Sequence, residues 1–168
     1  MKIVFLGIGS NLGNREANMN QAVAAIEQSV GRVLRTSSFY ETEPWGFHSD
    51  DAFLNMVIMV ETKLSATELL GEILNIESSL GRTRNNDRYS SRIIDIDILL
   101  YDDIITDEPD LKIPHPLMHE RKFVLIPLCE IASEKIHPVL KKTFRELLDV
   151  CGDNSNVTAL PPCPPEGG

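Results

Sequence analysis

The sequence lacks long hydrophobic runs, has little basic charge and contains few cysteines. No stretch approaches the roughly 20 apolar residues that a membrane-spanning helix needs. Its 168 residues include 16 basic and 25 acidic side chains, a formal net charge of −9, so binding to nucleic acid is not expected. The three cysteines form no CxxC pair, so neither a disulfide framework nor a structural zinc site is predicted. We therefore expect a cytoplasmic protein with no membrane or nucleic-acid partner.

Two common phosphate-binding motifs are also missing. There is no GxxxxGK[ST] segment, which excludes a P-loop. The segment 7–13, Gly-Ile-Gly-Ser-Asn-Leu-Gly, nearly matches GxGxxG after an expected strand, but its third glycine comes one residue late. The chain is also too short for two mononucleotide-binding halves. A tight turn between a strand and a helix explains these glycines.

Hydrophobic periodicity predicts a βαββαβ order followed by a helical portion. The expected strands span residues 2–8, 32–41, 53–62 and 93–101. The expected helices span residues 14–30, 65–80, 119–133 and 143–151. This order favours an α+β sandwich, with helices packed on a mixed sheet. We expect one domain over residues 1–160 and a disordered Pro/Gly-rich tail over residues 161–168.

Local signals refine three of these elements. Ser65 and Glu68 are spaced as a capping box at the start of the second helix, and Gly81 ends it. A turn at residues 102–103 precedes the pair at 104–105, which could form a hairpin. Pro127 is expected to interrupt the helix at 119–133.

The strand at 93–101 carries two acidic residues. Because side chains alternate along a strand, Asp95 and Asp97 should share one face, with Cα atoms about 6.6 Å apart. The isoleucines between and beside them should then point into the core. Two carboxylates without a nearby His or Cys suit Mg²⁺, which is often held by one or two carboxylates and substrate phosphates. The alternative is a half-exposed strand whose acids discourage edge pairing.

The loop before this strand is locally basic. Residues 82–92 contain four arginines and one acidic residue, and guanidinium groups suit phosphate oxygens. A solvated charged loop would be an adequate explanation if this loop stood alone. A basic loop leading directly into paired carboxylates instead indicates a nucleoside-triphosphate site.

Other candidate residues lie elsewhere in the chain. Downstream, His115 stands between two prolines, and Arg121 and Phe123 follow. Trp45, the only tryptophan, lies in a Pro/Gly-containing loop, where a large ring is as often part of a lid as of the core.

Six separated blocks, in order, resemble the 6-hydroxymethyl-7,8-dihydropterin pyrophosphokinases of folate biosynthesis, over roughly residues 3–150. The blocks are Gly-Ser-Asn-Leu at 9–12, Ser-Ser-Phe-Tyr-x-Thr at 37–42, Phe-Leu-Asn at 53–55, Glu-x-x-x-Gly-Arg-x-Arg at 77–84, Arg-x-x-Asp-Ile-Asp-Ile at 92–98, and Pro-His at 114–115 with Arg-x-Phe at 121–123. The block at 92–98 is a highly specific signature.

The resemblance implies a ferredoxin-like α+β domain that transfers pyrophosphate from ATP to the hydroxymethyl group of the pterin and releases AMP. It implies that Asp95 and Asp97 bind two Mg²⁺ ions and, with Arg82 and Arg92, form the catalytic set. The implied ATP-binding residues are Glu77, Arg82, Arg84, Arg92, Ile98, His115 and Arg121. The implied pterin-binding residues are Thr42, Pro44, Trp45, Phe53, Asn55, Asp95 and Phe123, with the ring stacked between the two phenylalanines.

The sequence departs from the family pattern in places and leaves two alternatives open. Tyr89 stands where the family usually has Trp, and Thr42 is followed by Glu-Pro-Trp rather than by a more aliphatic loop. One alternative is a regulatory domain of this fold that senses ATP, for which Phe53, Asn55 and Phe123 would have no purpose. The other is an ordinary kinase that releases ADP. We expect small-molecule substrates only and a monomeric enzyme.

Overall fold

The computed structural model describes residues 1–42, 52–81 and 93–160. Its elements are, in order, β1 (Lys2–Ser10), α1 (Arg15–Ser29), β2 (Gly31–Thr36), β3 (Tyr40–Thr42), β4 (Phe53–Thr62), α2 (Ala66–Ser79), β5 (Asp95–Tyr101), β6 (Thr106–Glu108), β7 (Leu111–Ile113), the 3-10 turn η1 (Met118–Glu120), α3 (Lys122–Ala132), α4 (Phe144–Asp149) and β8 (Val157–Ala159). The main sheet has the order β5-β1-β4-β3-β8, with β2 also paired to β4. All strand pairings among the described residues are antiparallel. The expected α+β class is confirmed, and the first part of the chain has the ferredoxin-like arrangement.

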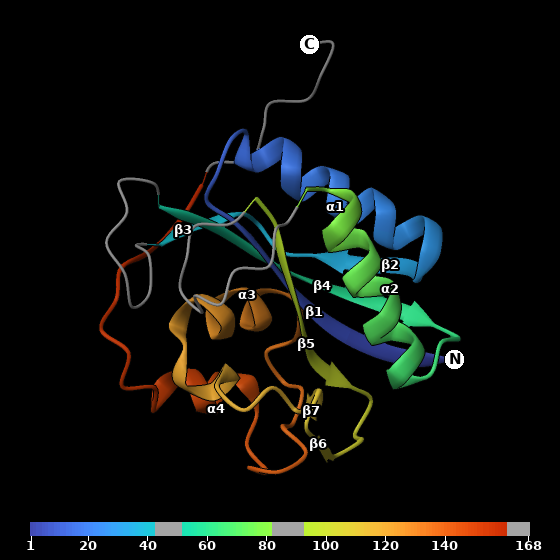
Figure 1. Cartoon of the computed structure of the whole chain (residues 1–168). Helices are drawn as coiled ribbons and strands as arrows, with labels where there is room; N and C mark the ends of the chain where they lie inside the picture. Colours follow the sequence, from blue (N-terminus) through green and yellow to red (C-terminus); the bar gives the residue numbers. More distant parts are fainter. Residues whose placement is uncertain (43–51, 82–92, 161–168) are drawn as a thin grey trace.

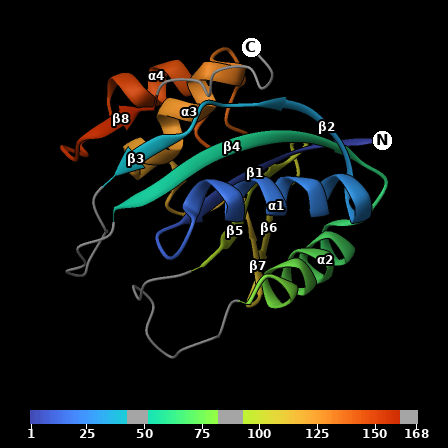
Figure 2. The same cartoon turned by 90° about the horizontal axis from the view of Figure 1, so that it is seen from above.

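The sheet separates two hydrophobic cores (Figures 1 and 2). Helices α1 and α2 cover one face, and α3 and α4 cover part of the other. Alternation along β1 divides its side chains between the cores, so Leu6 and Ile8 lie in the first and Phe5 in the second. The candidate residues of β5 and β4 share the face that α3 and α4 cover only in part.

The predicted capping signals are present in the structure. The Ser65 hydroxyl accepts a hydrogen bond from the Glu68 backbone N–H at 3.2 Å, and the Glu68 carboxylate accepts from the Ser65 N–H at 3.3 Å. Gly81, just after α2, has φ = 91°, a left-handed conformation that glycine adopts without strain. The expected end of this helix is therefore confirmed.

The expected strand at 32–41 is instead two strands, β2 and β3. The Ser37 hydroxyl accepts a hydrogen bond from the Val57 N–H at 2.9 Å, a place in the ladder that a backbone carbonyl normally takes. The Ser37 N–H donates to the Val57 carbonyl at 2.9 Å. This side-chain bond interrupts regular pairing, and β3 then resumes with Tyr40 opposite Asn55.

Two further expectations on the second half of the chain are corrected, and one strand there is unexpected. The hairpin is formed by β6 and β7 rather than by residues 104–105, because Ile105 is 62% exposed and has no core to enter. Pro127 lies inside a continuous α3 and is buried; its missing N–H removes only one helical hydrogen bond. Strand β8, which the sequence pattern does not predict, pairs with β3 along the sheet edge.

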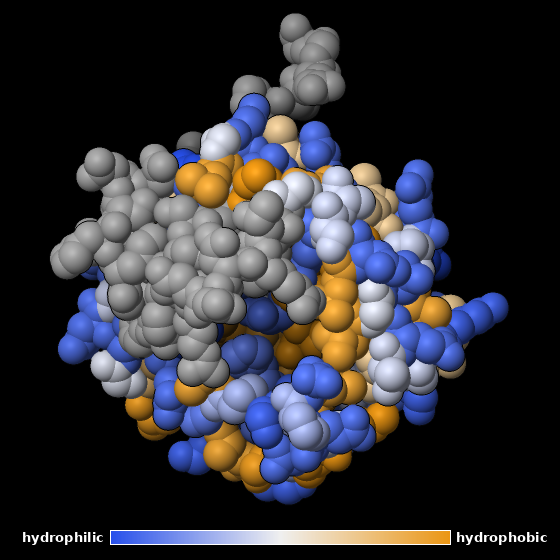
Figure 3. Space-filling view, viewed as in Figure 1, coloured by the Kyte–Doolittle hydropathy of each residue, from blue (hydrophilic) through white to orange (hydrophobic). Residues whose placement is uncertain are grey.

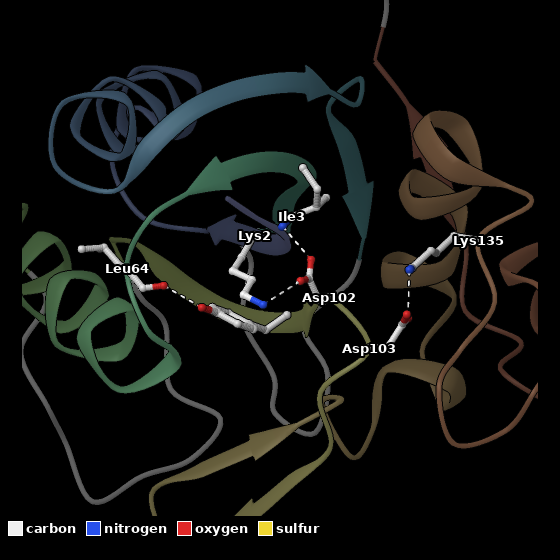
Figure 4. Close-up of polar contacts among 7 residues, drawn as sticks. Lys2, Ile3, Leu64, Asp102, Asp103 and Lys135 are labelled. Carbon is white, nitrogen blue, oxygen red and sulfur yellow. Dashed lines mark hydrogen bonds and ion pairs between the residues drawn. The ribbon is translucent and has the colours of Figure 1, made fainter.

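The turn after β5 holds that strand in place (Figure 4). Asp102 has φ = 46°, and its carboxylate accepts a hydrogen bond from the Ile3 N–H at 2.8 Å. The Tyr101 hydroxyl donates to the Leu64 carbonyl at 2.7 Å. Asp103 forms an ion pair with Lys135 at 3.1 Å. The expected turn at 102–103 is confirmed, and its contacts tie the end of β5 to β1, to the loop before α2 and to the segment after α3.

Candidate active site

Asp95 and Asp97 lie on one face of β5, as expected from strand alternation. Both are half-buried, whereas Ile96 and Ile98 between and beyond them are buried in the first core. Asp97 pairs in register with Gly7 of β1, and Asp95 pairs with Gly9. The two carboxylates therefore stand beside a strand that carries no side chains at these two positions.

Gly9 lies between the acidic strand and the polar end of β4. It pairs with Asp95 on one side and with Asn55 on the other. A Cβ atom at Gly9 would lie 2.9 Å from Asn55 Oδ1 and 3.8 Å from Phe53 Cδ1. The absence of this methyl group leaves the room in which Asn55 and Phe53 sit.

Asn55 is held by a buried hydrogen bond. Its Nδ2 donates to the Thr42 hydroxyl at 2.9 Å, and the two residues are only 8% and 5% exposed. Because the amide nitrogen is engaged there, Oδ1 is the atom that Asn55 turns toward Gly9. Thr42 also pairs in register with Phe53. The structure thus brings three of the expected pterin-binding residues together.

His115 is placed near the acidic strand by its backbone. Its N–H donates to the Leu99 carbonyl at 3.0 Å, and its Nδ1 accepts from the Leu117 N–H at 3.1 Å. Burial lowers the pKa of His115 to about 4, with a further lowering by the Arg121 charge and an opposing effect of Asp95. The imidazole is therefore neutral at pH 7. Since Nδ1 accepts, its proton lies on Nε2.

Arg121 and Phe123 are presented by the start of α3. The Arg121 guanidinium lies 5.7 Å from the centre of the Phe123 ring, a distance typical of a cation–π contact. The first helical N–H, of Lys122, donates to the Asp153 carboxylate at 2.9 Å. A residue 31 positions away thus caps the helix that begins beside Arg121 and carries Phe123.

Glu77 and Ile98 lie on the other side of the sheet. Glu77, at the end of α2, is 4% exposed, and its carboxylate accepts a hydrogen bond from the Ile96 N–H at 2.9 Å. Ile98 is 8% exposed within the first core. The Ile98 side chain therefore lies behind Asp95 and Asp97, whereas the Glu77 carboxylate reaches the outer edge of β5, where it binds the Ile96 N–H.

Five expected site residues lie outside the described residues. They are Pro44, Trp45, Arg82, Arg84 and Arg92. Their roles remain predictions, as do the effect of Tyr89 and the nature of the tail at 161–168.

The structure also reveals residues that the sequence pattern does not single out. Asp153 caps α3, and Arg15 of α1 bonds to Glu41 and to the Ala52 carbonyl. A capping residue is normally found by its position just before the helix, a signal that a distant residue such as Asp153 does not carry. Arg15 does carry a signal, because a basic residue in the first turn opposes the helix dipole. Such a residue is expected to bind a partner outside its own helix.

Figure 3 shows hydrophilic and hydrophobic surface adjoining at a recess near the middle of the view. Among residues 1–42, 52–81 and 93–160, no group of three or more His, Cys, Asp or Glu side chains could hold a metal ion. Two carboxylates on one strand are nevertheless a donor set that suits Mg²⁺ when phosphates complete its coordination.

Among the described residues, no helix is both long and apolar enough to cross a membrane.

Comparison with known proteins identifies one family. The model of 7,8-dihydro-6-hydroxymethylpterin-pyrophosphokinase (HPPK) matches residues 5–133. A 2-amino-4-hydroxy-6-hydroxymethyldihydropteridine pyrophosphokinase of Porphyromonas gingivalis is 44% identical over 141 residues, which cover 82% of this chain and 95% of that protein. The protein of the same name from Aquifex aeolicus is 38% identical over 146 residues, covering 87% and 90%.

Solved structures support the same fold. Wild-type HPPK-DHPS of Plasmodium falciparum with SDX-DHP superposes with a TM-score of 0.71 at 19% identity, over 89% of this chain and 43% of that chain. The chain therefore spans less than half of that larger protein. At this identity the likeness shows the fold alone.

Proposed function

The chain belongs to the 7,8-dihydro-6-hydroxymethylpterin-pyrophosphokinase family and is a pyrophosphokinase of folate biosynthesis, and from this premise we propose how its residues carry out the transfer. In the proposed reaction, the hydroxymethyl oxygen of 6-hydroxymethyl-7,8-dihydropterin attacks the β-phosphorus of ATP. The bond from that phosphorus to the oxygen bridging it to the α-phosphate breaks, and AMP leaves. The hydroxyl proton is lost to solvent.

The observation that carries the proposal is the juxtaposition of two unlike half-sites on one face. Asp95 stands across Gly9 from Asn55, with Asp97 beside Gly7 on the same face and Phe53 near Gly9. At one end, two carboxylates that can hold Mg²⁺ suit phosphates. At the other end, an amide and an aromatic ring suit a flat heterocycle edged with donors and acceptors. Attack on a phosphate needs mainly positioning and charge neutralisation, and two adjacent half-sites supply the positioning.

We assign the acidic half-site to Mg²⁺. Asp95 and Asp97 would hold two ions, and these would neutralise the charge of the ATP phosphates when bound. The donor set fits, because both ligands are carboxylates and they share one face of β5.

His115 and Arg121 would bind phosphate oxygens in different ways. Neutral His115 would donate a hydrogen bond from Nε2, since Nδ1 is already engaged by the Leu117 N–H. Arg121 would supply a permanent positive charge. Arg82, Arg84 and Arg92, which lie outside the described residues, are assigned to the phosphates by the family pattern alone.

The pterin half-site would recognise both the edge and the faces of the ring. Asn55 Oδ1 would accept a hydrogen bond from a ring N–H, because Nδ2 is committed to Thr42. Phe53 and Phe123, both half-buried, would pack against the two faces of the ring, with Pro44 and Trp45 nearby by the family pattern. We propose that residues 1–160 form this single domain, acting as a monomer.

The test is to identify the products by ³¹P NMR with ATP, Mg²⁺ and the hydroxymethyl dihydropterin. We expect AMP and a pterin diphosphate. ADP would show simple phosphoryl transfer, and ATP binding without turnover would favour a sensing domain; either result would refute the proposal.

A matched pair of variants tests the acidic half-site. Asp97→Asn should abolish turnover and leave the fold intact, because it removes a charged Mg²⁺ ligand. Asp107→Asn is the control, since Asp107 lies on β6 with 83% of its side chain exposed and pairs with Lys112. Near-normal turnover of Asp97→Asn at saturating Mg²⁺ would show that the metal assignment is wrong.

A further inference from the structure

Arg15, the first residue of α1, bridges two segments that are distant in the sequence. Its guanidinium donates to the Ala52 carbonyl at 2.8 Å and to the Glu41 carboxylate at 3.0 Å. The two bonds come from different nitrogens, Nη1 to Ala52 and Nη2 to Glu41, as the planar fork of a guanidinium allows. Arg15 therefore joins the end of β3 to the residue that precedes β4.

These two segments carry pterin-binding residues proposed above. Glu41 stands between Tyr40 and Thr42 in β3, and Ala52 directly precedes Phe53. Thr42 and Phe53 are paired in register. Because alternate side chains of a strand point to opposite faces, Glu41 points to the α1 face while Thr42 points to the site. Arg15 thus acts from behind the sheet, without touching the proposed pterin position.

The position of Arg15 in its helix argues against a role in stabilising that helix. A positive charge in the first turn is unfavourable to the helix dipole. The helix start is already capped by Asn14, whose side chain accepts from the Ala17 N–H at 3.1 Å. The Arg15–Glu41 ion pair is also partly exposed, with side-chain exposures of 29% and 39%, so it adds little to global stability.

We infer that Arg15 is a positioning residue for the pterin half of the site. Arg15 fixes the distance between the end of β3 and the start of β4. By doing so it also fixes the positions of the Thr42–Asn55 hydrogen bond and of the Phe53 ring. The inference rests on the proposed function, because it assigns the effect to the pterin rather than to ATP.

The experiment measures pterin and ATP dependence separately. Arg15→Gln should raise the KM for the pterin by about tenfold, because the β3 end and the β4 start must then be ordered when the pterin binds; a tenfold change corresponds to about 1.4 kcal/mol. The KM for ATP and the urea unfolding midpoint should stay unchanged. Arg15→Lys should show a smaller rise, because an ammonium keeps the charge beside Glu41 but lacks the two-nitrogen fork that binds both partners here.

Two further variants separate positioning from general damage. Arg35→Gln is the matched control, because Arg35 donates to the Ile131 carbonyl at the same distance, 2.8 Å, but on the opposite side of the sheet from α1. Its pterin KM should match the wild type. The double variant of Arg15→Gln with Glu41→Gln should be no worse than Arg15→Gln alone, because both remove the same bridge.

Several results would overturn the inference. One is an unchanged pterin KM in Arg15→Gln, with the wild-type protein forming AMP normally. Another is a parallel rise of both KM values with a lower unfolding midpoint, which would make Arg15 merely structural. A wild-type protein that neither binds the pterin nor forms AMP would overturn the proposed function and this inference together.

Discussion

Replacing Gly9 with alanine tests the geometry of the pterin half-site directly. The added Cβ would lie 2.9 Å from Asn55 Oδ1 and 3.7 Å from the Leu54 carbonyl. The first distance is closer than a carbon and an oxygen normally approach, so one of the two groups must move. Asn55 cannot move freely, because its Nδ2 is held by the Thr42 hydroxyl at 2.9 Å in a buried position.

The cost follows from these two choices. If Asn55 stays, the strain resembles that of overpacking a core, about 1–3 kcal/mol. If Asn55 swings away, a buried hydrogen bond is lost, which also costs about 1–3 kcal/mol. If Asn55 swings away, its proposed hydrogen bond to the pterin is lost as well; a loss of the same size, at about 1.4 kcal/mol per tenfold change, weakens pterin affinity by roughly 5-fold to 140-fold.

Gly7→Ala is the matched control for Gly9→Ala. Gly7 lies on the same strand and face, and a Cβ there would meet Leu99 Cδ1 at 3.5 Å, an ordinary contact. Both substitutions restrict the unfolded chain equally, so this contribution cancels between them. Urea unfolding and pterin binding are measured for both. If Gly9→Ala matched Gly7→Ala in both measurements, the close approach of Gly9 to Asn55 would be refuted.

Three further predictions concern titration and capping. Burial lowers the pKa of His115 to about 4, below its unfolded value, so stability should fall as pH drops from about 6.5 to 4, by at most about 3 kcal/mol. His115→Asn, unfolded in urea without ATP or Mg²⁺, should lose that part of the pH dependence; an unchanged slope would contradict it. Burial raises the pKa of Asp153, but hydrogen bonds from Ser155 and from the Lys122 backbone outweigh it, so the pKa is lowered overall. The ionised carboxylate therefore stabilises the fold at pH values above its unfolded pKa, and this stabilisation is lost as the pH falls. Asp153→Ala should therefore cost about 1 kcal/mol at pH 7 and less in acid; equal costs at both pH values would argue against the cap. Burial and the Glu130 hydrogen bond raise the pKa of Tyr40 to about 12. Glu130→Ala should therefore lower this pKa toward 10, as measured by spectrophotometric titration. An unchanged pKa in the variant would show that Tyr40 and Glu130 are not in contact.

Local signals in the sequence predicted the elements that depend on neighbouring residues. The Ser65–Glu68 capping box needs only a spacing of three residues, and the structure contains both of its hydrogen bonds. The shared face of Asp95 and Asp97 follows from the alternation of any extended strand. The βαββαβ order and the α+β class follow from hydrophobic periodicity alone.

The differences between the expected and the observed elements share a cause, which is competition from distant partners. The break between β2 and β3 depends on Ser37 bonding to Val57, 20 residues away. Strand β8 forms because β3 offers it a free edge, and the short segment has no strong pattern of its own. Pro127 is accommodated within α3, whose neighbouring residues Val124, Leu125, Leu128 and Ile131 pack in the second core, and a local helix-breaker rule does not include that packing.

The sequence by itself determined the chemistry available to this protein: paired carboxylates on a strand, a basic loop before them, and the ordered blocks that identify the family. These are properties of residue type and short spacing. Only the tertiary structure decided which of these groups meet. The approach of Asn55 to Gly9, the neutral state of His115 and the bridge of Arg15 to Glu41 and Ala52 depend on strand register and burial, which arise only when segments far apart in the chain pack together.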